Sequence, residues 1–174
     1  MELRDGDLVL RSWAEEDVPV LVCACNDPEI TRWIPVIPTP YTEEDALGFV
    51  RGEVPGAPDH SFAIAVDDSV VGAIGMGVNS HGYRGTIGYW VAAWSRGKGV
   101  CTVALRTLAR WAFDDLELKR LELITDPENL GSQRVAEKVG FQREGVLRAY
   151  VVVRGEARDC VMYSLLASDV EITG

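Results

Sequence analysis

Apolar and polar positions alternate differently in the two halves of the chain. In the first half, short apolar runs predict a strand at 7–13, two short helices and then three further strands. These three strands are expected over 61–66, 69–78 and 84–93. Short turns join them, including Asp67-Asp68, so they should form an antiparallel meander. Three prolines between 33 and 41 restrict the backbone and predict an extended loop.

Helical spacing dominates the second half. Apolar residues share one face of a helix predicted over 97–113: Val100, Ala104, Leu108 and Trp111. Four more elements are predicted after it: a strand at 120–125, a helix at 129–139, and closing strands at 141–150 and 158–166. Gly140 suits the left-handed position that ends the second helix, and a hairpin turn is expected at 154–156. This order predicts a single α/β domain over 1–174, with a mixed, mostly antiparallel twisted sheet flanked by helices.

The composition is that of a globular chain with excess negative charge. Apolar residues make up 47% and charged residues 25% of the 174 residues, which argues against global disorder. The formal net charge of −10 disfavours nucleic acid and anionic membrane as partners and favours cationic partners such as amines. The same charge also keeps a globular protein soluble, so it does not by itself identify a substrate.

The cysteines and histidines do not predict a metal site. None of them stands at a ligand spacing: Cys23, Cys25, Cys101, Cys160, His60 and His81. We therefore expect no metal and reduced thiols in a cytoplasmic protein. The first ten residues contain three acids and no apolar run, unlike a signal peptide. No apolar stretch approaches the roughly 20 residues of a membrane-spanning helix.

A glycine-rich segment joins the third meander strand to the long helix. Gly97 and Gly99 allow backbone angles closed to other residues and a close approach by a ligand. The first N–H groups of a helix lack intrahelical acceptors, and the helix dipole favours an anion there. Arg96 and Lys98 add positive charge. The segment is therefore a candidate phosphate seat, with a ligand-free helix entry as the alternative. It matches neither a Walker loop nor a dinucleotide-binding fingerprint, since Thr102 stands where the latter needs glycine.

Several ordered motifs resemble the GNAT superfamily of N-acyltransferases. RGKGVC at 96–101 is similar to the signature R/Q-x-x-G-x-G/A, and IGYWV at 87–91 is the expected preceding strand. DPENLGS at 126–132 and EKVGF at 137–141 are similar to two further motifs of the superfamily. The resemblance covers nearly the whole chain and is greatest to the RimJ/RimL-type branch, which includes ribosomal-protein N-terminal acetyltransferases. Motifs in this number and order are specific.

The resemblance implies a site for acetyl-CoA, or another short acyl-CoA, as co-substrate. In the family, main-chain groups of the strand before the loop hold the pantetheine arm and the carbonyl: here Tyr89, Trp90 and Val91. The loop and first helical turn hold the diphosphate: here Arg96, Gly97, Lys98, Gly99, Val100, Cys101 and Thr102. Asn129 corresponds to an asparagine that bonds the pantetheine arm, although asparagine is also a favoured helix N-cap.

Cys101 departs from the signature, which usually has glycine or alanine at this position. A thiol is small enough to pack at a helix start, so we expect coenzyme binding to be retained. Because helix N-termini lower the pKa of thiols, Cys101 is also expected to react with electrophiles.

The family's reaction is direct attack of a primary amine on the thioester within a ternary complex, which makes the chain an acyl-CoA-dependent N-acetyltransferase. Ser132 corresponds to a serine that lies near the sulfur in this branch and helps to protonate the thiolate. Many other members use a tyrosine at the position of Ala136, and this acid is missing here. Glu122 and Asp126 are the candidate general bases, with water or an acceptor that arrives neutral as alternatives.

Four residues are expected to border the acceptor, or else to cover the core: Trp33, Ile34, Tyr41 and Tyr150. A protein N-terminus, a lysine and a small amine remain open as acceptors. An α-amine suits an enzyme without a strong base better, because its pKa is near 8 rather than 10.4. A non-catalytic acyl-CoA sensor or subunit is the alternative function. Members of this branch often dimerise, so a homodimer is one expected state.

Overall fold

The structure, a computed structural model, describes residues 1–170. Within this part of the chain, eight strands form one sheet in the order β1-β2-β3-β4-β5-β6-β8-β7. The strands are β1 (Glu2–Asp5), β2 (Leu8–Arg11), β3 (His60–Val66), β4 (Ser69–Val78), β5 (Arg84–Val91), β6 (Arg120–Thr125), β7 (Gln142–Val153) and β8 (Glu156–Leu166). Strands β5 and β6 run parallel, and the other neighbouring pairs are antiparallel. The predicted mixed, mostly antiparallel sheet is confirmed.

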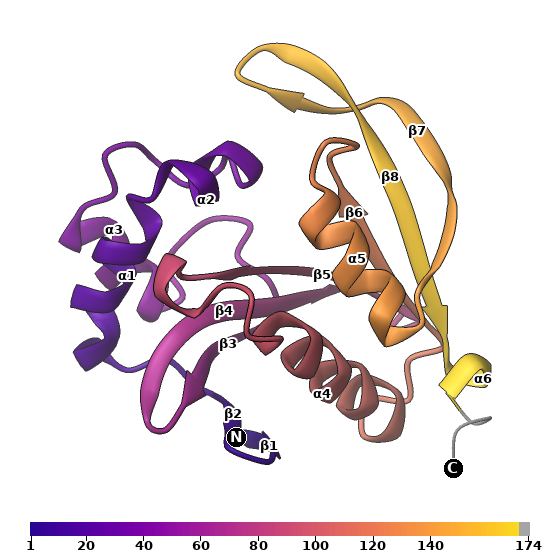
Figure 1. Cartoon of the computed structure of the whole chain (residues 1–174), viewed down its shortest axis with the longest axis horizontal. Coiled ribbons are helices and arrows are strands. Elements are labelled where there is room, and N and C mark those ends of the chain that lie inside the picture. The colour runs from indigo at the N-terminus through magenta and orange to yellow at the C-terminus, as the bar shows by residue number, and fades with distance from the viewer. Residues whose placement is uncertain (171–174) are drawn as a thin grey trace.

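Helices accompany the sheet in two groups (Figure 1). The first group is α1 (Val18–Cys25), α2 (Pro28–Trp33) and α3 (Glu43–Val50), and the second is α4 (Val100–Asp114) and α5 (Leu130–Val139). Three shorter helices complete the described chain: η1 (Glu15–Asp17), η2 (Ala93–Ser95) and α6 (Ala167–Val170). Among residues 1–170, no helix combines the length and apolarity needed to cross a membrane.

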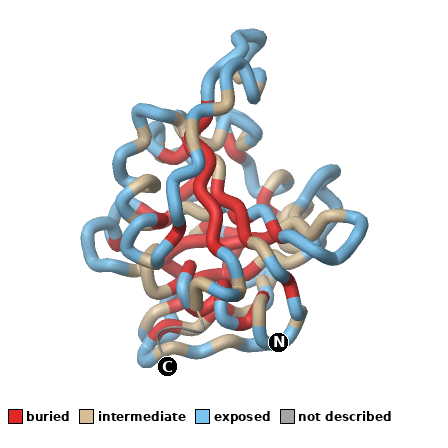
Figure 2. Tube along the Cα trace, turned by 90° about the vertical axis from the view of Figure 1, so that its right-hand side faces the viewer, coloured by how far each residue is buried: buried red, intermediate tan, exposed pale blue. Residues whose placement is uncertain are grey.

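The main core lies between one face of the sheet and α4. Buried residues of this helix, including Leu105 and Leu108, pack with strand residues such as Ile87. Because successive strand residues point to opposite faces, Tyr89 lies on this side, whereas Trp90 packs against the cluster formed by α1 and α3. Figure 2 shows buried strand segments through the middle of the molecule and an exposed hairpin tip projecting from it.

The structure corrects the predicted elements in three places. Strand β1 was missed because it is a short, half-exposed edge strand without a clear apolar pattern. Helix α2 was missed because its six residues are too few for a periodic apolar pattern, and Pro28 occupies its first turn, where proline is tolerated. The long helix begins at Val100 rather than at 97, because Gly97 and Gly99 have left-handed backbone angles.

Strands β5 and β6 pair over only four residues and then part. Their register runs from Arg84 opposite Arg120 to Ile87 opposite Leu123. Beyond this point β5 stays paired with β4 as far as Val91, and β6 stays paired with β8 through its last residue. Figure 1 shows the two strands diverging. The second half of β5 therefore has one edge without a strand partner.

Candidate active site

A cleft of 2110 Å³ runs through this opening in the sheet. Its walls include the glycine loop before α4, the start of α5, the diverging ends of β5 and β6, the loop after α2, and the β7–β8 hairpin. Segments far apart in the sequence therefore meet around one space.

The loop before α4 has the geometry that its glycines predict. Gly97 and Gly99 have φ angles of 75° and 79°. A Cβ atom at either position would meet no atom within 4 Å, so the loop borders open space. The amide of Thr102 donates to the carbonyl of Gly99 at 3.0 Å, whereas the amides before it precede any intrahelical acceptor. The amides of residues 97–101 are the donors available to an anion.

The two basic side chains of this loop lie in different surroundings. Arg96 donates through Nη2 to the carboxylate of Asp27 at 2.5 Å and through Nε to the carbonyl of Val91 at 3.3 Å. Lys98 lies outside the cleft lining and borders a separate hollow of 610 Å³. Three carboxylates line that hollow as well: Asp5, Asp7 and Asp67. The capacity of the loop to hold an anion therefore rests on its amides.

Cys101 corrects one expectation about the loop. Burial raises the pKa of its thiol to about 12, and the positive charge of Arg96 offsets this only in part. The predicted lowering of the thiol pKa was wrong, because desolvation outweighs the favourable position at a helix start. Cys101 lines the cleft as a small, protonated side chain.

The start of α5 lines the cleft opposite the glycine loop. Asn129 is its N-cap, and its Oδ1 accepts the amide of Ser132 at 3.0 Å. This cap uses the side-chain oxygen and leaves the Nδ2 group as a donor beside the cleft. Gly140 ends the helix with a φ angle of 102°, as the sequence predicts.

A hydroxyl pair bridges the opening between β5 and α5. The Tyr89 hydroxyl lies 3.0 Å from Ser132 Oγ and 3.3 Å from the carbonyl oxygen of Ser132. The sequence suggested a main-chain role for Tyr89 and missed this contact. Alternation along β5 places Tyr89 on the α4–α5 side, but the contact across 43 residues requires the tertiary structure.

The two residues of β5 after Tyr89 lie on opposite faces of the sheet. Trp90 lies on the opposite face and contacts the apolar clusters around α1 and α3. Val91 is buried on the α4 side, and its carbonyl accepts from Arg96. All three predicted residues of this strand line the cleft: Tyr89, Trp90 and Val91.

The acceptor candidates separate into two groups. Trp33, Ile34 and Tyr41 line the cleft on the α1–α3 side, with Tyr41 buried and held through its backbone by Asn26. Tyr150 lies in β7, is 53% exposed and is absent from the cleft lining. The hairpin contributes other residues to this wall: Val151, Val152, Val153, Arg158 and Cys160.

The two candidate bases also differ in position. Glu122 is buried away from the cleft lining, and Arg120 donates to its carboxylate at 2.8 Å while Arg84 lies 3.5 Å away. Asp126 does line the cleft, where it accepts the backbone amide of Glu128 at 2.8 Å and lies 3.6 Å from Arg158. The structure therefore brings Asp126, but not Glu122, to the same cleft as Ser132.

Two other features of the cleft were not expected from the sequence. Asp27, the N-cap of α2, pairs with Arg96 and so ties α2 to the glycine loop. Gly88 is exposed in the middle of the sheet, on the same side as Trp90, and leaves the floor of the cleft bare. Among residues 1–170, no three or more His, Cys, Asp or Glu side chains are grouped so that they could hold a metal ion.

Comparisons with known proteins agree with this geometry. The model of the acetyltransferase (GNAT) domain matches residues 7–142. The N-acetyltransferase p20 of Bacillus licheniformis is 32% identical over 166 residues, which is 91% of this chain and 92% of p20. A GNAT-family acetyltransferase of Bacillus anthracis has a similar structure, with a TM-score of 0.87 and 25% identity over 97% of this chain and 99% of that one.

The structural likeness extends to the RimJ/RimL-type branch. RimJ of Mycobacterium smegmatis, solved with a coenzyme A disulfide, has a TM-score of 0.83 and 25% identity, over 98% of this chain and 88% of RimJ. The cleft of the present chain has an amide-lined loop beside a strand with a free edge. The chain thus belongs to the GNAT acetyltransferase family and is an acetyl-CoA-dependent N-acetyltransferase.

Proposed function

We propose that the chain transfers an acetyl group directly from acetyl-CoA to the α-amine of a peptide or protein. One observation carries this proposal: a single cleft joins the amide-lined loop before α4 to the aromatic loop after α2, through the gap between β5 and β6. Donor and acceptor can therefore meet at the sheet without a covalent intermediate on the protein. Another short acyl group would use the same path.

Direct attack requires three things of the site. The amine nitrogen forms a bond to the thioester carbon, the carbon–sulfur bond breaks and its electron pair goes to sulfur. The attacking nitrogen loses one proton, and the thiolate gains one. Backbone N–H groups on the free edge of β5 are suited to stabilise the oxyanion that develops on the carbonyl. Holding both substrates in one cleft supplies proximity.

The carboxylates near the sheet opening are already engaged by other groups, which favours an acceptor amine that is often unprotonated at neutral pH and needs no strong base. Arginines surround Glu122, and Asp126 already accepts a backbone amide. An α-amine with a pKa near 8 is unprotonated roughly 200 to 300 times more often at neutral pH than a lysine with a pKa near 10.4. We infer that Asp126, directly or through a water, accepts the remaining proton.

Glu122→Gln should lower stability without lowering turnover. The buried carboxylate pairs with Arg120 and Arg84, and its neutral replacement leaves those guanidinium groups with a weaker partner. We expect a loss of about 1–3 kcal/mol in the free energy of unfolding, measured by urea denaturation, and a kcat within about threefold of the parent. A hundredfold loss of kcat in a protein of unchanged stability would instead make Glu122 the base.

The proposal is tested by measuring thiol release with peptides matched in sequence. One peptide has a free N-terminus and an acetylated lysine, and its partner has an acetylated N-terminus and a free lysine. We expect kcat/KM for the first to exceed that for the second by at least tenfold, and to rise with pH up to about 8. Preference for the lysine peptide would refute the assignment of an α-amine.

Two further readouts define the limits of this function. Running the same screen with acetyl-, propionyl- and succinyl-CoA determines the acyl preference. Tight coenzyme binding without thiol release, across peptides and small amines, would favour a non-catalytic acyl-CoA sensor. A homodimer and a cytoplasmic location stay predictions from the sequence.

A further inference from the structure

The leaving sulfur needs a hydrogen-bond donor, and the start of α5 offers one hydroxyl to it. Ser132 lies in the first turn of α5 and lines the cleft, whereas Ala136, one turn later, has no polar group. An aliphatic hydroxyl is a poor acid when it acts alone. The environment of Ser132 therefore determines how well it can stabilise a thiolate.

Tyr89 supplies that environment from the other side of the opening. Its hydroxyl lies within hydrogen-bond distance of two oxygens of the same residue, Ser132 Oγ and the Ser132 carbonyl. The phenol has one hydrogen, which can go to the carbonyl or to Oγ, and in the shorter contact between the two hydroxyls either oxygen can be the donor. Burial raises the pKa of Tyr89 above its ordinary value, so the phenol keeps this hydrogen throughout the neutral range.

The amide of Ser132 is already fixed by the cap of its helix. It donates to Asn129 Oδ1 at 3.0 Å, which holds the first turn in place. In the arrangement in which Tyr89 donates to Ser132 Oγ, the serine hydroxyl has its own hydrogen left to donate. The cleft is the side on which a substrate atom can accept that hydrogen.

We propose that Tyr89 is a positioning residue that makes Ser132 a hydrogen-bond donor to the sulfur of coenzyme A as the thioester breaks. This inference rests on the proposed function and adds to it a side chain from β5. The chain of donors runs from the Tyr89 hydroxyl to Ser132 Oγ and from Ser132 to sulfur. Linked hydrogen bonds of this kind polarise one another in a site of low polarity.

The step balances without any further reactant. As the carbon–nitrogen bond forms and the carbon–sulfur bond breaks, the electron pair of the latter moves to sulfur, which accepts the hydrogen bond from Ser132. The proton lost by the attacking nitrogen finally resides on the thiol. Tyr89 and Ser132 each keep their own proton, so neither needs to be restored between turnovers.

Tyr89→Phe tests the inference because it removes one hydroxyl and keeps the ring. We expect kcat to fall about tenfold to a hundredfold, as for loss of a hydrogen bond to a developing charge, while the KM for acetyl-CoA changes less than threefold. Ser132→Ala should lose as much, and the double variant should be no worse than Ser132→Ala. Multiplied losses in the double variant, or a kcat unchanged or raised by Tyr89→Phe, would overturn the inference.

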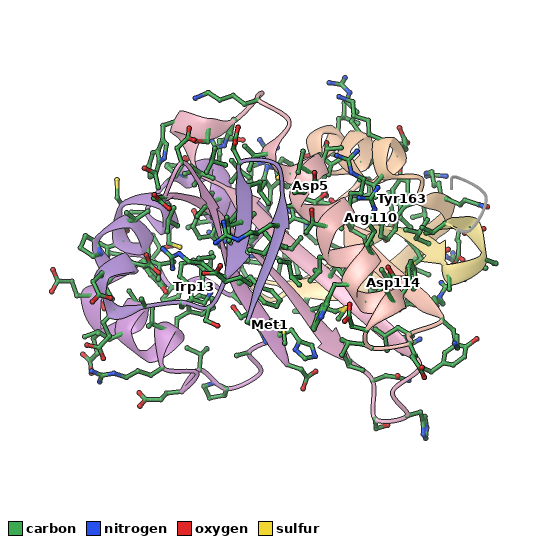
Figure 3. All side chains as sticks on the ribbon, turned by 90° about the horizontal axis from the view of Figure 1, so that it is seen from below. Met1, Asp5, Trp13, Arg110, Asp114 and Tyr163 are labelled. Atoms are coloured by element: carbon green, nitrogen blue, oxygen red, sulfur yellow. The ribbon has the colours of Figure 1, made fainter. Side chains whose placement is uncertain are left out.

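Tyr163→Phe is the matched control for loosening of the helix. Tyr163, labelled in Figure 3, donates from β8 to Glu137 of α5 at 2.9 Å. This variant also removes a hydroxyl that ties α5 to the sheet, through Glu137 in the last turn and a longer contact of 3.4 Å with Gln133, but it leaves the contact between Tyr89 and Ser132 in place. We expect its kcat to stay within about twofold of the parent. A loss equal to that of Tyr89→Phe would attribute both effects to helix position and overturn the inference.

A second measurement separates this inference from the proposed function, because it needs no acceptor. Bound coenzyme A is titrated by the ultraviolet absorbance of its thiolate. Donation by Ser132 should lower the pKa of the bound thiol in the parent protein, and Tyr89→Phe should raise it by about one unit. An unchanged thiol pKa refutes the role of Tyr89 whatever the acceptor. A lowered thiol pKa in a parent protein that acetylates no amine, with the rise in Tyr89→Phe, would leave the donor chain supported and refute the proposed acceptor.

Discussion

Gly99→Trp should abolish measurable binding of coenzyme A. The residue has a φ angle of 79°, which costs an L-amino acid about 1–2 kcal/mol. A side chain there projects into open space beside the amides of residues 97–101, because no atom lies within 4 Å of its Cβ position. An indole would cover the donors that a diphosphate needs. We expect the dissociation constant, measured by calorimetry, to rise at least a hundredfold.

Gly82→Trp is the matched control for the backbone strain. Gly82 lies in the turn between β4 and β5, has a φ angle of 60° and has no atom within 4 Å of its Cβ position. It lies outside the cleft lining. We therefore expect a similar loss of stability with unchanged coenzyme binding. Normal saturation kinetics in Gly99→Trp would remove the loop from the coenzyme site.

Gly88→Leu should block the acceptor while leaving the donor bound. Gly88 lies on the face of β5 opposite Tyr89, where a Cβ would meet nothing within 4 Å. Its neighbour in register, Gly75, is by contrast covered by Pro58. A leucine at 88 would occupy the bare floor where the two substrates meet. Since misplacement of about 1 Å costs roughly a hundredfold, we expect kcat/KM for the acceptor to fall at least that much.

Coenzyme affinity is the internal control for this variant, and it should change less than threefold. Gly88→Ala should give an intermediate loss. Gly77→Leu places the same bulk on the same face of β4, with Asp59 Oδ2 as its nearest neighbour at 3.9 Å, opposite Thr86 rather than Gly88. We expect it to cost less than tenfold. Near-parental turnover in Gly88→Leu would place the acceptor elsewhere.

The sequence predicted most of the fold because its local signals agree with the tertiary structure. The meander is marked by tight turns, α4 by its apolar stripe, and α5 by a cap at each end, Asn129 and Gly140. Helix α2 was missed because six residues are too few for a periodic pattern, and tertiary contacts place it: Ile30 is buried against Ala24 and Ala92, and Asp27 and Arg32 form ion pairs. Local patterns do not encode such contacts.

Part of the candidate site could likewise be predicted from the sequence and part could not. Main-chain features were predictable, since the glycines at 97 and 99 indicate the left-handed backbone conformation that the structure shows there. Side-chain roles were less predictable because they depend on which strands and helices meet. The alternation of apolar and polar residues along the strands did not predict that Glu122 pairs with arginines, that Tyr89 contacts Ser132, or that Tyr150 lies outside the cleft lining.

The short pairing of β5 with β6 should make the stability of the folded protein depend on its ligand. Four residue pairs join β5 to β6. Under the proposed function, the pantetheine arm of acetyl-CoA would lie along the part of β5 that has no strand partner. A ligand bound only by the native state adds about 2.7 kcal/mol to its stability at 100 times the dissociation constant. Bound acetyl-CoA would thus occupy the unpaired edge of β5 and stabilise the sheet reversibly. Resistance of the protein to unfolding and proteolysis should accordingly follow the supply of acetyl-CoA.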